Sequence, residues 1–203
     1  MQGGATLTDT PTFIKKELLG TGGVAEGVYL AHVEGDEEKK YAIKVVQKFD
    51  EHRDPPEKIR VEKRFIEERN VLETLNKGKG YPFIVQMHYA FQTDKELCIV
   101  LEHLPCGDFW TLQKHFSTFP KMIAVFYSAQ IVLALQYIHG QDYIYGDLKP
   151  ENIILNCNGY IKLIDFGYSQ KTGSQGNNAH YCCLKGLVGT PDYMAPEILN
   201  GGS

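Results

Sequence analysis

The chain gathers its densest set of polar groups in one segment, Tyr145-Gly146-Asp147-Leu148-Lys149-Pro150-Glu151-Asn152-Ile153-Ile154-Leu155. Two carboxylates, an ammonium group and an amide occupy a turn-rich run that leads directly into an apolar strand. Such a concentration of polar and ionisable groups beside a buried strand indicates a functional site. Asp147, Lys149 and Asn152 are therefore the first candidate catalytic residues.

A second acid follows another apolar run, Leu163-Ile164-Asp165-Phe166-Gly167. Asp165 comes at the end of the strand predicted there and is followed by Phe-Gly, a position that suits a carboxylate holding a hard cation through oxygen. A carboxylate that only caps the turn is the alternative for Asp165.

Lys44 lies inside an apolar strand predicted over residues 41–46. A desolvated ammonium group is costly unless it meets an anion, so Lys44 requires a carboxylate partner. Glu68 is a candidate, because it lies on a helix predicted to begin near Pro55 and to end at the glycines after Lys77. A lysine at a sheet edge that extends its amine to water is the alternative.

Glycines cluster at Gly20-Thr21-Gly22-Gly23, between strand-like segments at residues 13–19 and 28–30. Glycines let backbone N–H groups approach a phosphate closely. A tight hairpin turn with no ligand is the alternative explanation.

Composition limits the class of protein. The 203 residues are 43% hydrophobic and 23% charged, so we expect a folded protein. The formal net charge is −4, so no overall positive charge favours binding to nucleic acid or anionic lipid. Five cysteines without a C-x-x-C pair predict free thiols. Unbroken apolar runs are short and no secretory signal is evident. We expect an intracellular, cytoplasmic protein without a membrane span.

The pattern changes along the chain. Residues 1–11 form an N-terminal extension, 12–101 a strand-rich lobe, 102–107 a connector, and 108–203 a second lobe with a helix over 121–139. A long loop is predicted over residues 168–186.

Taken in order, these segments resemble a eukaryotic protein kinase over nearly the whole chain. The motifs that carry the resemblance are Gly20-Thr21-Gly22, Ala42-Ile43-Lys44, Glu68, the D-L-K-P-E-N run from Asp147, the D-F-G of Asp165 and the G-T-P-D-Y-M-A-P-E run from Gly189. Features at Glu68, Tyr89 and Tyr145 resemble the AGC group, which contains the cyclic-nucleotide-dependent, ribosomal-S6 and protein kinase C-type enzymes. Lys149 and Thr190 resemble the serine/threonine signature.

The resemblance implies a two-lobed α+β fold and transfer of phosphate from ATP, with Mg²⁺, to Ser or Thr hydroxyls of proteins. Asp147 would orient and deprotonate the hydroxyl, Lys149 would steady the γ-phosphate, and Asn152 and Asp165 would bind Mg²⁺. Lys44, held by Glu68, would contact the α- and β-phosphates.

The remaining implied contacts concern nucleotide and substrate. The nucleotide would meet the glycine-rich turn, two strands, the gatekeeper Leu101 and the connector, that is Gly20, Thr21, Gly22, Gly23, Val28, Ala42, Lys44, Leu101, Glu102, Leu104 and Ile154. The substrate would meet Asp108, Glu151 and Thr190, and the two acids favour an Arg-rich site. Solvated acids are the alternative for both. A regulatory stack would comprise Leu72, Met87, Tyr145 and Phe166.

The sequence departs from the family at three places. The third glycine of the loop is Ala25, and Val28 comes one residue late. Gly146 replaces an arginine that in relatives grips a phosphothreonine, and Gly186 stands at the acceptor position, so we expect activity without phosphorylation there. Other acceptors are Ser169, Thr172, Ser174 and Tyr181.

The third departure is the end at Ser203, six residues after Glu197. We expect a truncated larger lobe with exposed apolar surface on the 121–139 helix, and the chain as a fragment of a longer one. The sequence favours a serine/threonine kinase. A non-catalytic nucleotide-binding or interaction module is the alternative.

Overall fold

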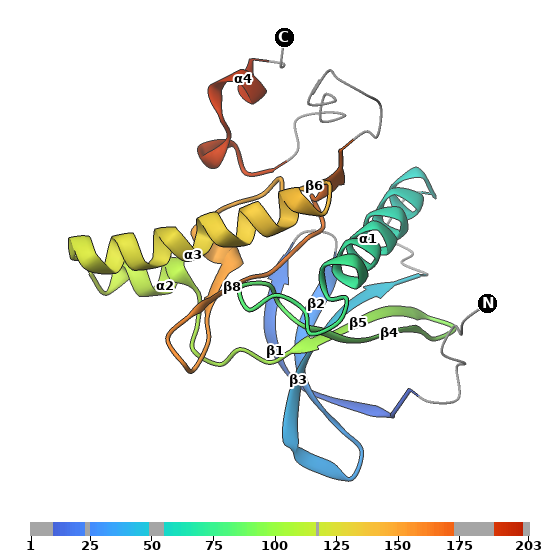
Figure 1. The fold of residues 1–203 in the computed structure, drawn as a ribbon. Coiled ribbons are helices and arrows are strands. Elements are labelled where there is room, and N and C mark those ends of the chain that lie inside the picture. The colour runs from blue at the N-terminus through green and yellow to red at the C-terminus, as the bar shows by residue number, and fades with distance from the viewer. Residues whose placement is uncertain (1–9, 23–24, 49–54, 117, 173–188, 201–203) are drawn as a thin grey trace. The chain divides into compact units, whose positions relative to one another are not determined.

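The computed structural model describes residues 10–22, 25–48, 55–116, 118–172 and 189–200. The chain forms two compact units (Figure 1). The first comprises Met1–Arg69 and Gln86–His103, and the second comprises Asn70–Val85 and Leu104–Ser203. The lobe boundaries given by the sequence patterns remain a prediction.

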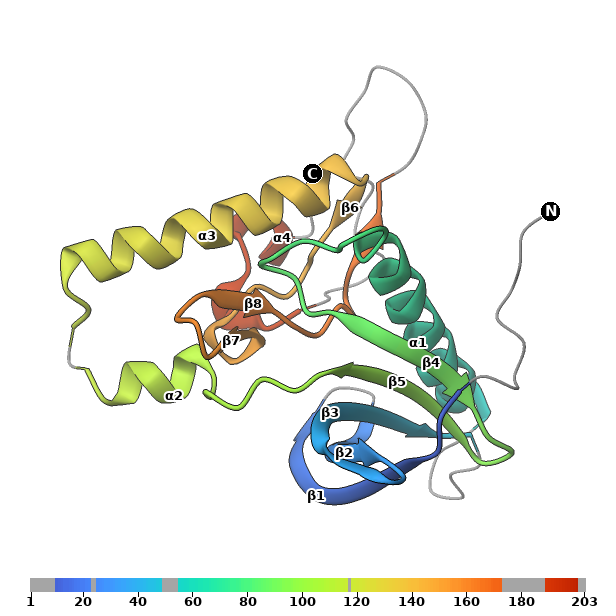
Figure 2. The same ribbon diagram turned by 60° about the horizontal axis from the view of Figure 1, so that its bottom comes forward.

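An antiparallel sheet of five strands forms the frame of the first unit, in the order β1-β2-β3-β5-β4 (Figures 1 and 2). The strands are β1 (Phe13–Gly22), β2 (Ala25–Val33), β3 (Asp36–Gln47), β4 (Met87–Gln92) and β5 (Glu96–Glu102). The strands predicted over residues 41–46 and 97–101 lie within β3 and β5.

One face of this sheet carries the core of the first unit. Tyr29, Ile43 and Val100 are cross-strand partners on β2, β3 and β5 and lie on this face. Its buried members are Ala31, Tyr41, Ile43, Val45, Cys98 and Val100. Because side chains alternate along a strand, the residues between them, Ala42 and Lys44, lie on the other face.

Helix α1 (Pro55–Leu75) connects β3 to the second unit. It begins at a proline pair, as predicted, because the missing N–H of proline costs nothing in the first turn. Gly78 and Gly80, with φ values of 69° and 67°, follow its last turn and end the helix. Val61, Phe65 and Glu68 recur at helical spacing and are all buried.

The second unit is mainly helical. Its longer elements are α2 (Phe109–Lys114), α3 (Lys121–Gly140) and α4 (Pro196–Leu199). The short elements are β6 (Tyr143–Ile144), η1 (Pro150–Asn152), β7 (Ile153–Leu155), β8 (Ile161–Leu163), β9 (Gln170–Lys171) and η2 (Pro191–Tyr193). Two small antiparallel sheets pair β6 with β9 and β7 with β8.

Side chains of α3 attach this helix to the rest of the second unit. The Gln130 carbonyl oxygen accepts the N–H of Ile161 on β8 at 2.9 Å. The Tyr137 hydroxyl donates to the carbonyl of Leu75 at 2.8 Å, and its ring stacks on Tyr81 with centroids 4.2 Å apart. These bonds satisfy polar groups that burial would otherwise penalise.

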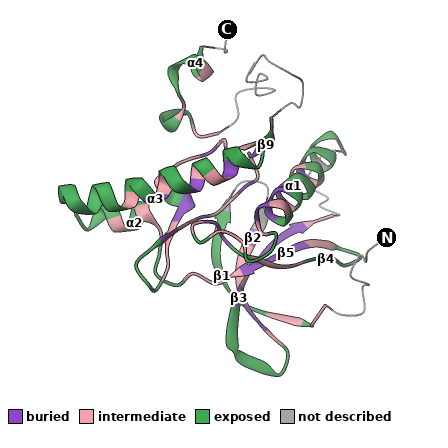
Figure 3. Ribbon diagram, viewed as in Figure 1, coloured by how far each residue is buried: buried purple, intermediate pink, exposed green. Residues whose placement is uncertain are grey.

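The opposite side of α3 is exposed (Figure 3), and it carries apolar residues, as expected. Met122 is 84% exposed, Val125 60% and Val132 61%, whereas Ala134 and Ile138 are fully buried. By length and composition alone, this helix is apolar enough to cross a membrane, with a mean hydropathy of 1.4. The apolar runs in the sequence are too short to indicate such a helix. Core helices of globular proteins meet the same criterion of length and composition, so the criterion does not distinguish them from a membrane span.

Within the loop predicted over residues 168–186, residues 170 and 171 form β9, which pairs with β6. That part of the prediction is wrong, because the pairing is made with a strand distant in sequence. The remainder of the segment, with Cys182, Cys183 and Gly186, lies outside the described residues. Cys98, Cys106 and Cys157 are free thiols, as predicted.

Candidate active site

Asp147 is the centre of the second unit's polar cluster. Its side chain is buried, with the residue only 3% exposed, and it lies in the loop between β6 and η1. Lys149 approaches Oδ2 to 2.8 Å, and the Asn152 amide donates to the same oxygen at 3.0 Å. The Thr190 hydroxyl donates to Oδ1 at 2.9 Å. Both oxygens of a buried carboxylate are therefore compensated, as burial of a charge requires.

Lys149 completes the cluster. Its Nζ also donates to the Thr190 hydroxyl at 2.9 Å, so the hydroxyl accepts from the cation and donates to the carboxylate. Burial acts to lower the pKa of Lys149, but the hydrogen bond and charge of Asp147, with the charges of Asp165 and Glu151, outweigh it and raise that pKa. The amine is accordingly held as a cation at neutral pH.

Asp165 follows β8 with its backbone in the left-handed region, at φ 55°. Among the described residues only Asp142 shares this property without being glycine. Non-glycine residues reach this region at an energetic cost and are enriched at functional sites. The N–H of Gly167 donates to Oδ1 of Asp165 at 3.3 Å.

Asn152 lies close to Asp165 along the backbone. The N–H of Ile164, the residue before Asp165, donates to the Asn152 carbonyl at 3.0 Å. The Asn152 amide nitrogen donates twice to Asp147, which turns the amide oxygen away from that residue. A carboxylate and an amide oxygen are ligands that Mg²⁺ accepts, usually together with phosphate oxygens and water. Within the described residues, no group of three or more His, Cys, Asp or Glu side chains could hold a metal.

Two aromatic rings support this region. Tyr145 and Phe166 are buried, and their rings meet edge to face with centroids 5.1 Å apart. The Tyr145 hydroxyl donates to the carbonyl of Ile164. Two members of the predicted stack, Tyr145 and Phe166, are therefore in contact.

The first unit contains a buried ion pair. Lys44 on β3 donates to both oxygens of Glu68 on α1, each at 2.7 Å. The residues are only 7% and 2% exposed. The structure therefore supplies the carboxylate that a lysine inside an apolar strand requires.

The sheet aligns other predicted nucleotide contacts with Lys44. Gly20, Val28 and Lys44 are successive cross-strand partners on β1, β2 and β3. Ala42 is the partner of Leu101 on β5, two residues from Lys44 on the same strand. Val28, Ala42, Lys44 and Leu101 therefore share the face opposite the core cluster.

The other predicted residues lie in varied settings. Glu102 ends β5 and accepts the N–H of Gln86 at 2.7 Å through its carboxylate. Asp108 caps α2 by accepting the N–H of Thr111 at 2.6 Å and forms an isolated bridge with Ile154. Leu104 is half-buried and Glu151 is exposed. Thr21 and Gly22 end β1, and Gly23 lies outside the described residues.

The sequence patterns did not predict two features of the site, the hydrogen bonds of Thr190 and the close contact at Gly146. Thr190 is bonded directly to Asp147 and Lys149, which nothing in the local sequence indicated. Gly146 has φ 85°, and a Cβ there would meet the Tyr168 carbonyl oxygen at 2.5 Å. The presence of glycine next to the candidate catalytic acid was the available signal.

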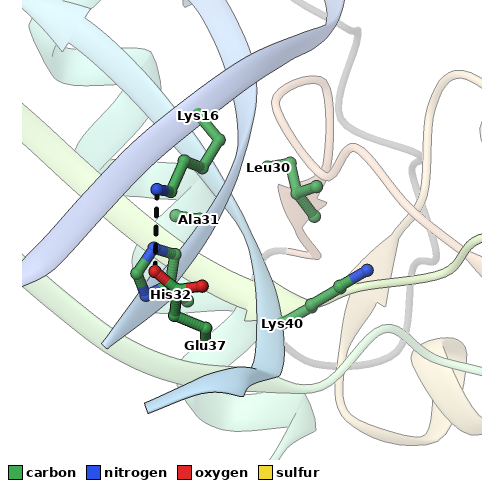
Figure 4. Close-up of a pocket in the computed structure, with 6 residues that line it drawn as sticks. All are labelled: Lys16, Leu30, Ala31, His32, Glu37 and Lys40. Carbon is green, nitrogen blue, oxygen red and sulfur yellow. Dashed lines mark ion pairs between the residues drawn. The ribbon is translucent and has the colours of Figure 1, made fainter. Parts of the chain in front are cut away.

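A small pocket in the first unit involves none of these residues (Figure 4). Its lining is Lys16, Leu30, Ala31, His32, Glu37 and Lys40. The Lys16 amine lies 4.0 Å from the Glu37 carboxylate across it. His32 is buried and its Nε2 has no hydrogen-bond partner within the described part of the chain. The pocket therefore does not carry the predicted chemistry.

Comparison with known proteins shows the family. The protein kinase domain matches residues 13–203. The chain belongs to the protein kinase family. This kinase chain is 37% identical over 193 residues to ribosomal protein S6 kinase alpha-2 of Mus musculus, covering 95% of the chain and 24% of the relative.

Other relatives of the chain are also protein kinases. It is 36% identical over 193 residues to the putative ribosomal protein S6 kinase alpha-1 of Caenorhabditis elegans, covering 95% of the chain and 23% of the relative. Protein kinase 3 of Dictyostelium discoideum is 35% identical over 194 residues, with 91% and 20% covered. The resemblance to the S6 kinases of the AGC group is confirmed. The chain spans about a quarter or less of the length of these curated relatives.

Proposed function

We propose that this chain is a serine/threonine protein kinase that transfers the γ-phosphate of ATP, with Mg²⁺, to Ser or Thr hydroxyl groups of proteins. The observation that carries the proposal is the buried Asp147 carboxylate, held on both oxygens by Lys149, Asn152 and Thr190. Phosphoryl transfer depends mainly on positioning and on neutralisation of charge, and this cluster is built for both.

Asp147 accepts a hydrogen bond from the substrate hydroxyl and takes its proton as the oxygen attacks phosphorus. Lys149 is cationic and within hydrogen-bond reach of the carboxylate, so it is the group in this cluster that can balance negative charge on the transferred phosphate. Thr190 holds both side chains through one hydroxyl, and this fixes their separation.

ATP and Mg²⁺ are the cofactors that this proposal requires. In the first unit, Lys44 holds phosphate oxygens and Glu68 orients Lys44, while Val28, Ala42 and Leu101 give an apolar face to adenine. In the second unit, Asp165 and Asn152 offer oxygen ligands to Mg²⁺, and the bound metal would neutralise phosphate charge. Glu102, Leu104, Ile154 and residues 20–23 are proposed as further nucleotide contacts.

We assign the substrate as a protein Ser or Thr beside basic residues. Glu151 is exposed and available to pair with a guanidinium group. Asp108 is a helix cap, which uses one of its oxygens, so its part in recognition is the weaker of the two. The activity is proposed to be intracellular, in the cytoplasm.

Activity is proposed to be independent of an arginine clamp on a phosphothreonine. Gly146 occupies the arginine position with φ 85° and close to the Tyr168 carbonyl. Ser169, one of the alternative acceptors, is buried and donates to the Tyr145 carbonyl at 2.9 Å, so a kinase could reach it only after local opening.

The test is phosphate transfer from Mg·ATP to an arginine-containing Ser/Thr peptide. Asp147→Asn should abolish transfer, because the amide cannot accept the proton. Asp142→Asn is the matched control: Asp142 is exposed, has φ 61°, and lies outside the cluster, and asparagine tolerates that backbone. Equal activity in both variants would contradict the role of Asp147.

A nucleotide-binding module is the competing function, and the same preparation tests it. A ligand that binds only the folded state raises the melting temperature. A rise with Mg·ATP but no transfer by the unmodified chain would favour the module over the kinase. Transfer to a tyrosine peptide in place of the Ser/Thr peptide would overturn the proposed acceptor.

A further inference from the structure

Two exposed cysteines of the second unit lie side by side. The Sγ atoms of Cys106 and Cys157 are 3.4 Å apart, although 51 residues separate them in sequence. Cys106 lies in the turn before α2, and Cys157 lies in the turn between β7 and β8. Both residues are exposed, so reagents in solution reach them.

The backbone fixes this proximity on both sides. The N–H of Leu155 donates to the Gly107 carbonyl at 2.9 Å, and Asp108 forms a bridge with Ile154. The N–H of Cys157 donates to its neighbour's side chain, Asn156 Oδ1, at 2.7 Å. Backbone contacts thus tie the two turns together within three residues of each cysteine.

We propose that Cys106 and Cys157 are a redox site, which forms a reversible disulfide by exchange with a low-molecular-weight disulfide such as glutathione disulfide. A disulfide bond is about 2.05 Å long, so the two sulfur atoms must approach by about 1.4 Å. The site lies outside the Asp147 cluster, and the proposal does not rest on kinase activity.

The exchange proceeds in two balanced steps. The thiolate of Cys157 attacks one sulfur of glutathione disulfide, which forms a mixed disulfide and releases one glutathione thiolate. The thiolate of Cys106 then attacks the Cys157 sulfur of the mixed disulfide, which forms the internal bond and releases the second glutathione. Both protein thiols are oxidised, one disulfide is reduced to two thiols, and the two cysteine protons pass to the glutathiones.

The order of attack follows from the hydrogen bond. Cys106 donates to the sulfur of Cys157, and this bond, with desolvation, raises the pKa of Cys106. A raised pKa leaves less of Cys106 as the thiolate that attacks a disulfide. Cys157 is therefore the first thiol to react and Cys106 the second.

Cys98 is an internal control. It is 3% exposed on β5, and burial, with the charge of Glu96, raises its pKa to about 11. A buried thiol that stays protonated at neutral pH is a poor nucleophile. Cys98 should therefore stay reduced while the exposed pair reacts.

The experiment incubates the folded 203-residue chain in a glutathione redox buffer, blocks free thiols with an alkylating agent, and digests without reduction. Trypsin places Cys157 in residues 122–162 and Cys106, with Cys98, in residues 96–114. Mass spectrometry should detect these peptides joined, and dithiothreitol should separate them. Fragment ions should assign the bond to Cys106 and show Cys98 alkylated.

Three cysteine variants and a denatured control test whether the link needs Cys106, Cys157 and the folded chain. Cys106→Ser and Cys157→Ser should each lose the linked peptide, whereas Cys98→Ala should keep it. In the Cys106→Ser variant, glutathione should remain attached to Cys157. Oxidation in urea should yield much less of this link, because the turns no longer hold the thiols together.

Three results would overturn the proposal. One is full alkylation of Cys106 and Cys157 in oxidising glutathione buffer. Another is a bond from Cys157 to Cys98, Cys182 or Cys183 in preference to Cys106. The third is equal yield of the link in folded and denatured chains, which would show that the structure does not promote it.

Discussion

Thr190 donates its hydroxyl hydrogen to Oδ1 of Asp147 over 2.9 Å, across 43 residues of sequence. The same hydroxyl accepts from Lys149 at 2.9 Å, and Lys149 in turn lies 2.8 Å from the other oxygen of Asp147. The three side chains therefore form a closed ring of charge-assisted hydrogen bonds, and such bonds are stronger than neutral ones. Residue 190 fixes the position of the proposed catalytic acid from a distant part of the chain.

Loss of the Thr190 hydroxyl should lower kcat. A hydrogen bond to a charged group contributes about 1.5–3 kcal/mol, so Thr190→Ala should reduce kcat about 10- to 150-fold. Thr190→Ser keeps the hydroxyl and should retain activity within a few-fold. Steady-state kinetics with Mg·ATP and a Ser/Thr peptide would measure both, and equal losses in the two variants would show that the hydroxyl is not the group that matters.

Two adjacent glutamates of α1 should differ sharply in their effect on stability. Glu68 is buried against Lys44, whereas Glu67 is 4.0 Å from Lys63 with side chains 54% and 75% exposed. Glu68→Gln should lower the free energy of unfolding by about 3–5 kcal/mol, because it removes a carboxylate charge paired at 2.7 Å with a buried ammonium group. Glu67→Gln should change it by less than about 1 kcal/mol.

Urea denaturation of both variants gives the comparison directly. A double-mutant cycle with Lys44→Met would isolate the pair, because the loss of both charges should cost less than the sum of the two single losses. Additive losses would mean that Lys44 and Glu68 do not stabilise one another.

Replacing Gly146 with alanine should lower the stability of the chain, because the added Cβ would meet the Tyr168 carbonyl oxygen. A left-handed backbone costs an alanine about 1–2 kcal/mol relative to glycine. Gly159 shares this conformation, with φ 81° against 85°, but has no atom within 4 Å of an added Cβ. Gly159→Ala should therefore show the backbone cost alone, and Gly146→Ala should be less stable than it by thermal melting. Equal melting temperatures would mean that the loop moves away from an added Cβ at no cost in stability, and that position 146 could accommodate an arginine.

Alkaline pH should destabilise the chain partly through Cys98. Burial first, and the charge of Glu96 second, raise the pKa of this thiol to about 11 from an ordinary value near 9. Between these values the unfolded chain releases the proton and the folded chain retains it, so stability is full below about pH 9 and falls as pH rises towards 11.

The effect is limited to one proton, or about 1.4 kcal/mol per pH unit. Cys98→Ala should remove this part of the slope in urea denaturation at pH 8, 9, 10 and 11. Parallel curves for the two proteins would show that Cys98 ionises equally in the folded and unfolded states.

Much of the fold was predictable because its signals are local. The proline pair at Pro55 and the glycines after Lys77 bound α1, and alternation in residues 41–46 and 97–101 located β3 and β5. The Lys44 and Glu68 pair was also foreseeable, since an ammonium group in an apolar strand requires an anion. The pairing of β9 with β6 was not, because a strand of two residues has no pattern of its own.

The sequence by itself determined the family, the order of the elements, and which side chains carry the chemistry, because motif spacing and hydrophobic period are properties of neighbouring residues. Only the tertiary structure decided that Thr190 holds Asp147, that Gly146 faces a carbonyl oxygen, and that Cys106 meets Cys157. These contacts join residues from 22 to 51 positions apart. Hydrogen bonds and thiol contacts depend on separations of a few ångströms, and those separations exist only once the chain has folded.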